Sequence, residues 1–266
     1  MYETTYVRPA SLAEAAAIVS ADDEAKLLSG GQTLIPTMKQ RLARPSKVVD
    51  LARLAELQGI TVTADAVTVG AATTHAAVAA SSEVAAAIPA LAKLASCIGD
   101  PQVRHRGTLG GSVANDDPAA DYPAAVLGLG ATVVTDRREI PADDFFQGMF
   151  TTALEDGEII VRIVFPIPAR AGYAKFANPA SRYAMTGVFV AQMKDGSVRV
   201  AVTGAGQDGV FREGAMEEAL SSSWSADAVA GIKVDASDML SDIHGDAAYR
   251  ANLVTVMAKR AVAAAG

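Results

Sequence analysis

Short apolar runs alternate with helical patterns along the whole chain, and this order most limits the folds open to it. Residues 25–29 (AKLLS) and 47–51 (KVVDL) have the length and composition of short buried strands. Between the N-terminus and the first of these runs, apolar side chains recur at helical spacing over residues 12–19, with Ser11 as a candidate cap and Glu14 three residues later. These elements predict a first α/β unit.

The pattern changes to strict alternation at Ile60 and predicts a second unit. Residues 60–71 (ITVTADAVTVGA) alternate apolar and polar side chains around a turn at Ala64 and Asp65. An alanine-rich helical stretch from Glu83 to Ala95 follows. Two prolines at the end of residues 157–168 (GEIIVRIVFPIP) indicate the last strand of this unit and the start of a connection.

A third unit is predicted from Tyr173 onward. Two apolar strands flank a turn at Lys194, Asp195 and Gly196, and two helical stretches follow them, the last from Asp246 to Ala265. The whole chain is therefore expected to contain three α/β or α+β units.

Composition and charge exclude several classes of function. A net charge of -7 over 266 residues is a poor electrostatic match for nucleic acid or anionic lipid. The single Cys97 excludes an internal disulfide, and His75, His105 and His244 lack the spacing of metal ligands, so we expect no metal on this chain. No apolar run approaches the ~18 residues of a membrane span, and the N-terminus does not resemble a signal peptide. We therefore expect a cytoplasmic protein whose partner is a small molecule or another protein.

Two adjacent glycines follow the first predicted strand. Gly30 and Gly31 lie between an apolar run and a helix that is predicted to begin near Thr33 and to end at Arg44 and Pro45. The predicted apolar side of this helix consists of Leu34, Ile35, Met38 and Leu42. Glycines at this position form either a tight strand-to-helix turn or a cradle for a phosphate, because free N–H groups at a helix start favour an anion. The motif alone leaves both possibilities open.

A second cluster of hydroxyl groups and glycines lies downstream of Arg104 and Arg106. Its members are Thr108, Gly110, Gly111 and Ser112. Two such loops from different units could grip a pyrophosphate from both sides, which implies a dinucleotide. Asp121, just before a predicted helix at Tyr122, either caps that helix or accepts hydrogen bonds from ligand hydroxyls.

Four segments resemble the FAD-binding medium subunit of molybdenum hydroxylases, the superfamily of xanthine dehydrogenase and aerobic carbon monoxide dehydrogenase. These segments are residues 29–51, 98–124, 156–168 and 241–262. The resemblance extends over nearly the whole chain and implies an α+β protein with a two-domain FAD-binding fold of the PCMH type, followed by a C-terminal α+β domain. The implied limits are 1–55, 56–168 and 169–266. The first two domains would clamp FAD, and the third would close over or buttress the flavin side.

The resemblance also implies which residues contact FAD. Carried over position by position, the contacts fall on Leu28, Ser29, Gly30, Gly31, Gln32, Thr33, Leu34, Ile35, Ile98, Thr108, Gly110, Gly111, Ser112, Asp121, Ile160 and Lys175. Ile98 and Ile160 could equally be core residues, and Lys175 could be a surface charge on a strand. Apart from tuning of the flavin by Lys175, no catalytic residue is expected on this chain.

Gln32 stands where many flavoproteins of the broader two-domain architecture carry a histidine that is bonded to the flavin. An amide cannot serve as that nucleophile. The FAD is therefore expected to be held non-covalently.

The implied function is electron transfer within an oxidoreductase complex. In the family, the substrate is hydroxylated at a molybdenum cofactor on a large subunit, electrons pass through two [2Fe-2S] clusters on a small subunit, and the FAD delivers them to an external acceptor. A dimer of heterotrimers is the implied assembly. Two alternatives remain: a self-contained FAD-dependent oxidoreductase that acts directly on a small substrate, and a scaffold that has lost FAD.

Overall fold

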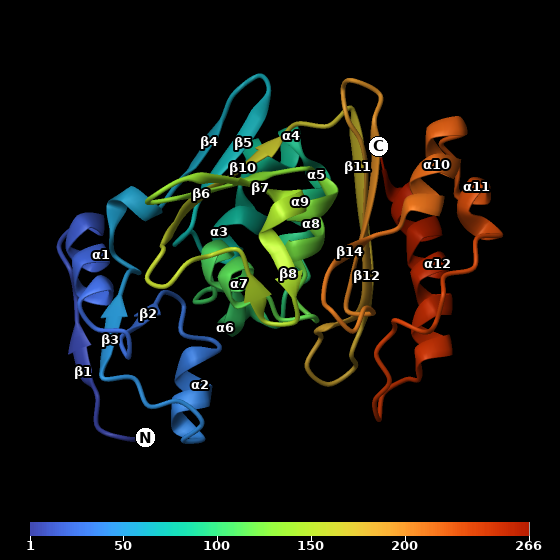
Figure 1. Cartoon of the computed structure of the whole chain (residues 1–266). Helices are drawn as coiled ribbons and strands as arrows, with labels where there is room; N and C mark the ends of the chain where they lie inside the picture. Colours follow the sequence, from blue (N-terminus) through green and yellow to red (C-terminus); the bar gives the residue numbers. More distant parts are fainter. Residues whose placement is uncertain (266) are drawn as a thin grey trace.

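Three of the four sheets in the described chain organise the fold, and these three follow one another across the molecule (Figure 1). The structure is a computed structural model that describes residues 1–265. Its mixture of helices and sheets confirms the predicted α+β class. The sheets cover residues 5–50, 60–166 and 170–212, whereas the domain limits given above stay a prediction, and Gly266 lies outside the described residues.

The first sheet is parallel, with strand order β1-β3-β2. Its elements are β1 (Thr5–Val7), α1 (Leu12–Ser20), β2 (Lys26–Leu28), α2 (Leu34–Lys39) and β3 (Lys47–Asp50). Parallel neighbours need crossover connections, and the two helices provide them. The two predicted strands are confirmed as β2 and β3. The edge strand β1 was not predicted, because its three residues are largely exposed and show no apolar run.

Helix α2 is shorter than predicted, and its apolar side does not include Leu42. Arg41 adopts a left-handed backbone conformation with φ of 62°. The N–H of Leu42 then donates to Thr37 O at 3.0 Å and that of Arg41 to Met38 O at 3.1 Å, which is a Schellman ending. Leu42 consequently lies outside the helix with 76% of its surface exposed.

The second sheet is antiparallel, with strand order β4-β5-β10-β6-β7. Its strands are β4 (Ile60–Val62), β5 (Ala66–Gly70), β6 (Thr132–Thr135), β7 (Glu139–Pro141) and β10 (Ile160–Pro166). The predicted turn between β4 and β5 is confirmed, because Thr61 pairs with Thr68. A short 3-10 helix, η1 (Ala55–Leu57), precedes the sheet in the chain. Between β7 and β10, β8 (Phe146–Gly148) and β9 (Thr151–Thr152) form a separate two-stranded hairpin.

Several short helices pack on one side of this sheet and enclose the largest core. They are α3 (His75–Ala80), α4 (Ser82–Ala87), α5 (Pro89–Ser96), α7 (Leu109–Asn115), α8 (Tyr122–Gly128) and α9 (Ala142–Phe145). The single turn α6 (Pro101–Arg104) contacts α3 and has no buried residue. The helix predicted from Glu83 to Ala95 is therefore two helices. Pro89 has no N–H to donate and forces Ile88 out of the helical conformation, so that α4 ends and α5 begins there.

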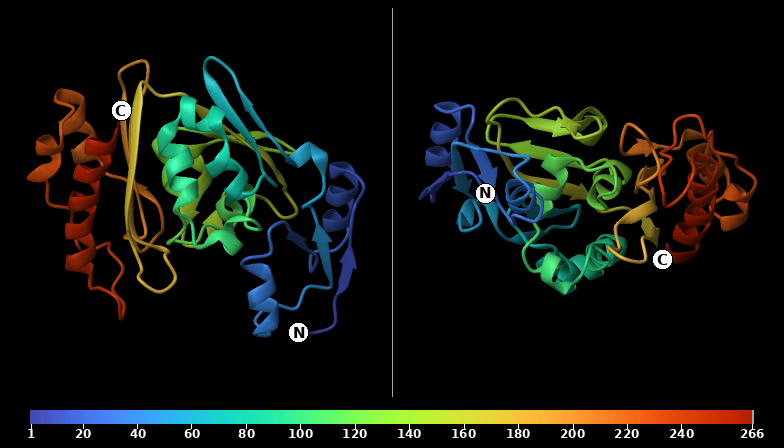
Figure 2. Two further views of the ribbon diagram at one scale, coloured as in Figure 1. Left: turned by 180° about the vertical axis from the view of Figure 1, so that it is seen from behind. Right: turned by 90° about the horizontal axis from the view of Figure 1, so that it is seen from below.

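The third sheet is an antiparallel meander, β11-β12-β13-β14. Its strands are β11 (Arg170–Ala177), β12 (Ala184–Gln192), β13 (Val198–Thr203) and β14 (Phe211–Arg212). One face carries α10 (Gly214–Ser222), α11 (Ala226–Ala230) and α12 (Ala247–Ala264), and the other contacts α5 and α8 (Figure 2). Three helices thus replace the two predicted stretches. Almost all of β12 is buried, because both faces of the sheet are covered.

Candidate cofactor site

A cavity of about 730 Å³ lies between the first two sheets and extends to the loop that joins β11 and β12. All residues that the sequence assigned to FAD contacts line it, with the exception of Ile35 and Lys175. Ile35 packs beneath Gly31, where a Cβ atom would lie 3.0 Å from its Cγ1. The structure thus gathers residues from four distant segments into one site, and their contact with FAD stays a prediction.

The first glycine loop presents unused N–H groups to this cavity. Gly31 turns the chain with φ of +71°. Among residues 1–265, no protein acceptor receives a hydrogen bond from the N–H groups of residues 30–34, and Ile35 is the first to donate, to Gly31 O at 3.2 Å. Unused backbone donors at the start of a helix are a suitable environment for phosphate oxygens.

The two glycine loops touch each other. A Cβ atom at Gly30 would lie 2.2 Å from Arg106 O, so only glycine permits this approach of the two backbones. The hydroxyl of Thr108 donates to Ser29 Oγ at 3.0 Å. The loops therefore form one continuous wall of the cavity.

The second glycine loop uses its own N–H groups and differs from the expectation of two equivalent phosphate cradles. Gly110 donates to Ala71 O at 2.8 Å, and Ser112 donates to Thr108 O at 3.1 Å. A Cβ atom at Gly110 would lie 2.5 Å from that of Ala71, whereas one at Gly111 would meet only Thr108 Oγ1, at 3.0 Å. Gly110 thus serves helix packing, whereas the only close neighbour of a Cβ at Gly111 within the described chain would be the Thr108 hydroxyl.

Asp121 does not cap α8, so that interpretation of the sequence is wrong. Its backbone is already helical and its side chain makes no capping bond. Instead the carboxylate, 4% exposed, accepts a hydrogen bond from Tyr173 Oη at 2.5 Å. Lys175 Nζ lies 2.9 Å from Oδ1 and 3.0 Å from Oδ2. Burial raises the pKa of Asp121, and Lys175 and the hydroxyl of Tyr173 oppose this rise.

Lys175 is neither a surface charge nor part of the cavity wall. Its side chain is 6% exposed and lies behind Asp121, which takes up its charge. The predicted influence of Lys175 on the flavin would therefore be that of an ion pair with Asp121 and not that of an isolated charge. Tyr173, the third member of the cluster, had no signal in the sequence, since it is distant from Asp121 and resembles any aromatic strand residue.

The third sheet also holds the backbone that precedes Asp121. Thr203 Oγ1 shares its single proton between Ala120 O at 2.6 Å and Pro118 O at 3.1 Å. The N–H of Gly204 donates to the same Pro118 oxygen at 2.8 Å. Because the acceptors are main-chain carbonyls, no residue pattern could have indicated these contacts. The ends of the third sheet therefore position one rim of the cavity.

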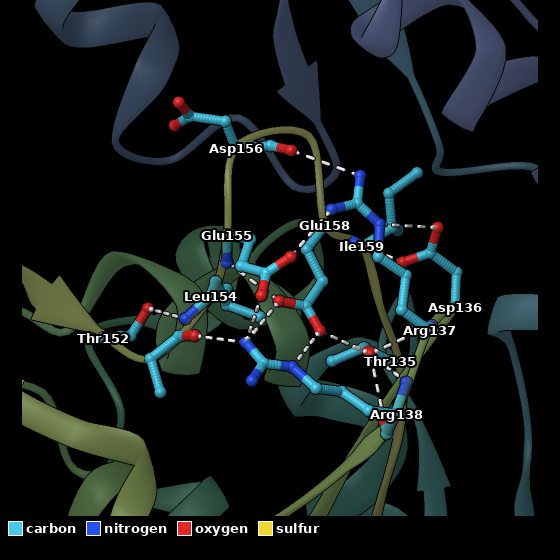
Figure 3. A network of polar contacts seen from close by, with 11 residues as sticks. Thr135, Asp136, Arg137, Arg138, Thr152, Leu154, Glu155, Asp156, Glu158 and Ile159 are labelled. Carbon is cyan, nitrogen blue, oxygen red and sulfur yellow. Dashed lines mark hydrogen bonds and ion pairs between the residues drawn. The ribbon is translucent and has the colours of Figure 1, made fainter.

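A polar network fixes the opposite wall (Figure 3). Glu158 accepts two hydrogen bonds from Arg138, each 3.0 Å long, and one from Thr135 at 2.7 Å. The guanidinium of Arg138 is the main cause that lowers the pKa of Glu158 to about 2. Ile159 N and O both bond to Asp136, at 2.8 and 2.9 Å. The network holds the residues that lead into Ile160 against the cavity.

Three buried titratable groups near the site have polar atoms without a partner within the described chain: His75, Asp116 and Tyr122. His75 lines the cavity, and its Nδ1 takes part in no hydrogen bond within the described chain. Burial lowers the pKa of His75 to about 4. Asp116, in the left-handed conformation at the end of α7, has both carboxylate oxygens unpaired, and burial raises its pKa to about 7. No role for His75 or Asp116 could be predicted from the sequence, because burial is not visible at a single position.

The residues present fit a dinucleotide. The cavity has a volume in the range of small-molecule sites, with unused N–H groups on one loop and a buried acceptor carboxylate. Ile98 and Ile160 add apolar surface to its lining. Such a combination can hold a phosphate-containing ligand at one part and a flat apolar ring at another.

Comparisons with known proteins agree with this geometry. A family model described as "FAD binding domain in molybdopterin dehydrogenase" matches residues 2–168. The carbon monoxide dehydrogenase medium chain of Hydrogenophaga pseudoflava is 36% identical, over 98% of this chain and 96% of that protein. The nicotine 6-hydroxylase medium subunit of Paenarthrobacter nicotinovorans is 37% identical over the same shares. A chain of the reconstituted CO dehydrogenase from Oligotropha carboxidovorans superposes with a TM-score of 0.89, at 32% identity and with 99% and 97% of the two chains covered.

Proposed function

The chain belongs to the family of FAD-binding domains found in molybdopterin dehydrogenases, and we propose that it is the FAD-binding, electron-transferring subunit of a heteromeric molybdenum hydroxylase. The observation that carries the proposal is the convergence of both glycine loops and Asp121 on one cavity. The relatives match over nearly their full length and nearly the whole of this chain, which supports the same division of labour among subunits.

Within the cavity, the N–H groups of residues 30–34 would bind the pyrophosphate of FAD. Asp121 would accept a hydrogen bond from a polar group of the cofactor, and Ile98 and Ile160 would flank its apolar surface. Gln32 offers only an amide, which supports non-covalent binding. When bound, FAD supplies the redox chemistry that links one-electron donors to an external acceptor.

The partners follow from the family. We propose a large subunit with the molybdenum cofactor and a small subunit with [2Fe-2S] clusters, in a dimer of heterotrimers that works in the cytoplasm. The names of two relatives, "medium chain" and "medium subunit", describe proteins of multi-subunit enzymes. None of the helices within residues 1–265 is long and apolar enough to cross a membrane.

Co-purification tests the proposal directly. The tagged chain, expressed in its native host, should be yellow, should release its FAD on acid denaturation, and should carry two further chains that contain molybdenum and iron. Isolated alone, it should keep its flavin oxidised when candidate substrates are added. Bleaching of the isolated chain by a substrate would instead favour the self-contained oxidoreductase, and a colourless chain that takes up no added FAD would favour the scaffold.

A further inference from the structure

We propose that Tyr173 is a positioning residue of the cofactor site, whose hydroxyl fixes the Asp121 carboxylate in the orientation in which it meets FAD. The inference rests on the proposed function, because Asp121 must face the cofactor for its orientation to matter. Tyr173 itself does not line the cavity and acts only through Asp121.

The cluster joins two units of the fold. Tyr173 and Lys175 are two positions apart on β11, so their side chains leave the same face of the strand. Both reach Asp121 at the start of α8, in the second unit. The side chains of Lys175 and Asp121 are almost fully buried, as is Tyr173, which makes their polar contacts strong and leaves little room for alternative partners.

Lys175 alone cannot fix the plane of the carboxylate. Its Nζ is almost equidistant from the two oxygens, at 2.9 and 3.0 Å, so the group can still turn about the line from Cγ to Nζ. Tyr173 contacts Oδ1 alone and therefore distinguishes the two oxygens. A carboxylate offers about four lone-pair sites, so acceptor capacity remains for a ligand after both contacts are made.

The surroundings of Tyr173 preserve this arrangement. Opposite β11, the neighbouring strand carries Gly187, where a Cβ atom would lie 2.6 Å from the hydroxyl oxygen. The ring packs on Phe189, with 6.1 Å between ring centroids. Burial holds the pKa of Tyr173 well above its usual value, so the hydroxyl keeps its proton and remains a donor.

A double-mutant cycle on the full chain tests the proposal. FAD is titrated into wild type, Tyr173→Phe, Asp121→Asn and the double variant, and the Kd of each is measured from flavin fluorescence. Loss of one hydrogen bond to a charged group should weaken FAD binding about ten-fold in Tyr173→Phe. The same change should have no further effect in the Asp121→Asn background, because the residue acts through that carboxylate. The midpoint potential of the bound FAD should follow the same pattern.

Tyr6→Phe is the matched control. The Tyr6 hydroxyl also donates to a carboxylate, that of Asp50, but on the first sheet and outside the cavity lining. This variant should bind FAD like the wild type. An equal loss of affinity from Tyr173→Phe in both backgrounds would assign the residue to packing and overturn the proposal, as would an unchanged Kd. A wild-type chain that binds no FAD would instead contradict the proposed function itself.

Discussion

At the scale of single residues, the site depends on carboxyl groups that the fold removes from water. The sequence allowed Asp121 to be either a helix cap or a ligand contact. Only the structure removes the first possibility, because the partners of Asp121 are Tyr173 and Lys175 on β11 of the third sheet. Lys175 was predicted as a cation beside the flavin. Its pairing with Asp121 makes the local net charge small, so any influence on the flavin potential is weaker than that of a free charge. Local sequence contains no information on such pairings.

Asp116 provides a pH-dependent prediction. Its pKa rises from about 4 in the unfolded chain to about 7 in the folded one, so the folded state binds more protons between these values and wild-type stability falls as the pH rises through this range. Asp116→Asn should abolish this fall, and asparagine tolerates the left-handed conformation. The difference in unfolding free energy between the variant and wild type should therefore shift in favour of the variant as the pH is raised from 4 to 8. The expected shift is about 1.4 kcal/mol for each unit by which folding raises the pKa of Asp116.

Urea unfolding of the FAD-free chain at the two pH values measures this gain. The exposed Asp65, changed to Asn, is the control and should leave the pH dependence as it is. A difference between Asp116→Asn and wild type that is the same at both pH values would contradict the prediction.

At the scale of elements, the sequence predicted the order of strands and helices better than their ends. The strands β2, β3, β4 and β5 followed from apolar runs and alternation. The end of α2 did not, because Arg41 takes a left-handed conformation that glycine usually occupies. The positions of the glycine loops were predicted from the sequence. The structural role of each glycine was not, because it depends on residues distant in sequence, such as Ala71 beside Gly110 and Arg106 beside Gly30.

The adjacent glycines of the second loop should respond differently to alanine. In Gly110→Ala, the new methyl group would overlap Ala71, so unfolding stability should fall by about 1 to 3 kcal/mol. In Gly111→Ala, the methyl group would press only on the hydroxyl of Thr108, a side-chain atom that can move, so stability should fall less than in Gly110→Ala, and FAD affinity should fall because Gly111 lines the cavity. Thermal unfolding without FAD and titration with FAD separate the two effects. Similar losses of stability in both variants would show that the two positions are equivalent.

At the scale of the whole molecule, the sequence indicated three units but not how they join. Ile159 belongs to the second unit in sequence and packs in the core of the first, with Val19 and Leu54. Thr203 of the third sheet holds carbonyls of the second unit. The proposed domain limits at residues 55 and 168 therefore separate segments that share cores and hydrogen bonds. Contacts of this kind arise from packing between distant segments and leave no local pattern.

Ile159→Ala should weaken both the fold and the site. Removal of a buried isoleucine side chain destabilises a protein by about 2 to 5 kcal/mol, and here the cavity is left between two units. Because the same segment supports the cavity wall, FAD affinity should fall as well. Ile88→Ala, equally buried but within the second unit, should reduce only stability. Retention of wild-type FAD affinity in Ile159→Ala would show that the wall does not depend on this junction.

The position of the cavity has a consequence for cooperativity. Its lining comes from the first sheet, from the helices of the second unit and from Ser181 and Tyr183 next to the third sheet. A ligand that contacts all of these segments stabilises only the state in which they are assembled, by an amount that grows with ligand concentration. Saturation with FAD should thus raise the melting temperature of all three units together, and the cofactor would act as a link between them as well as an electron carrier.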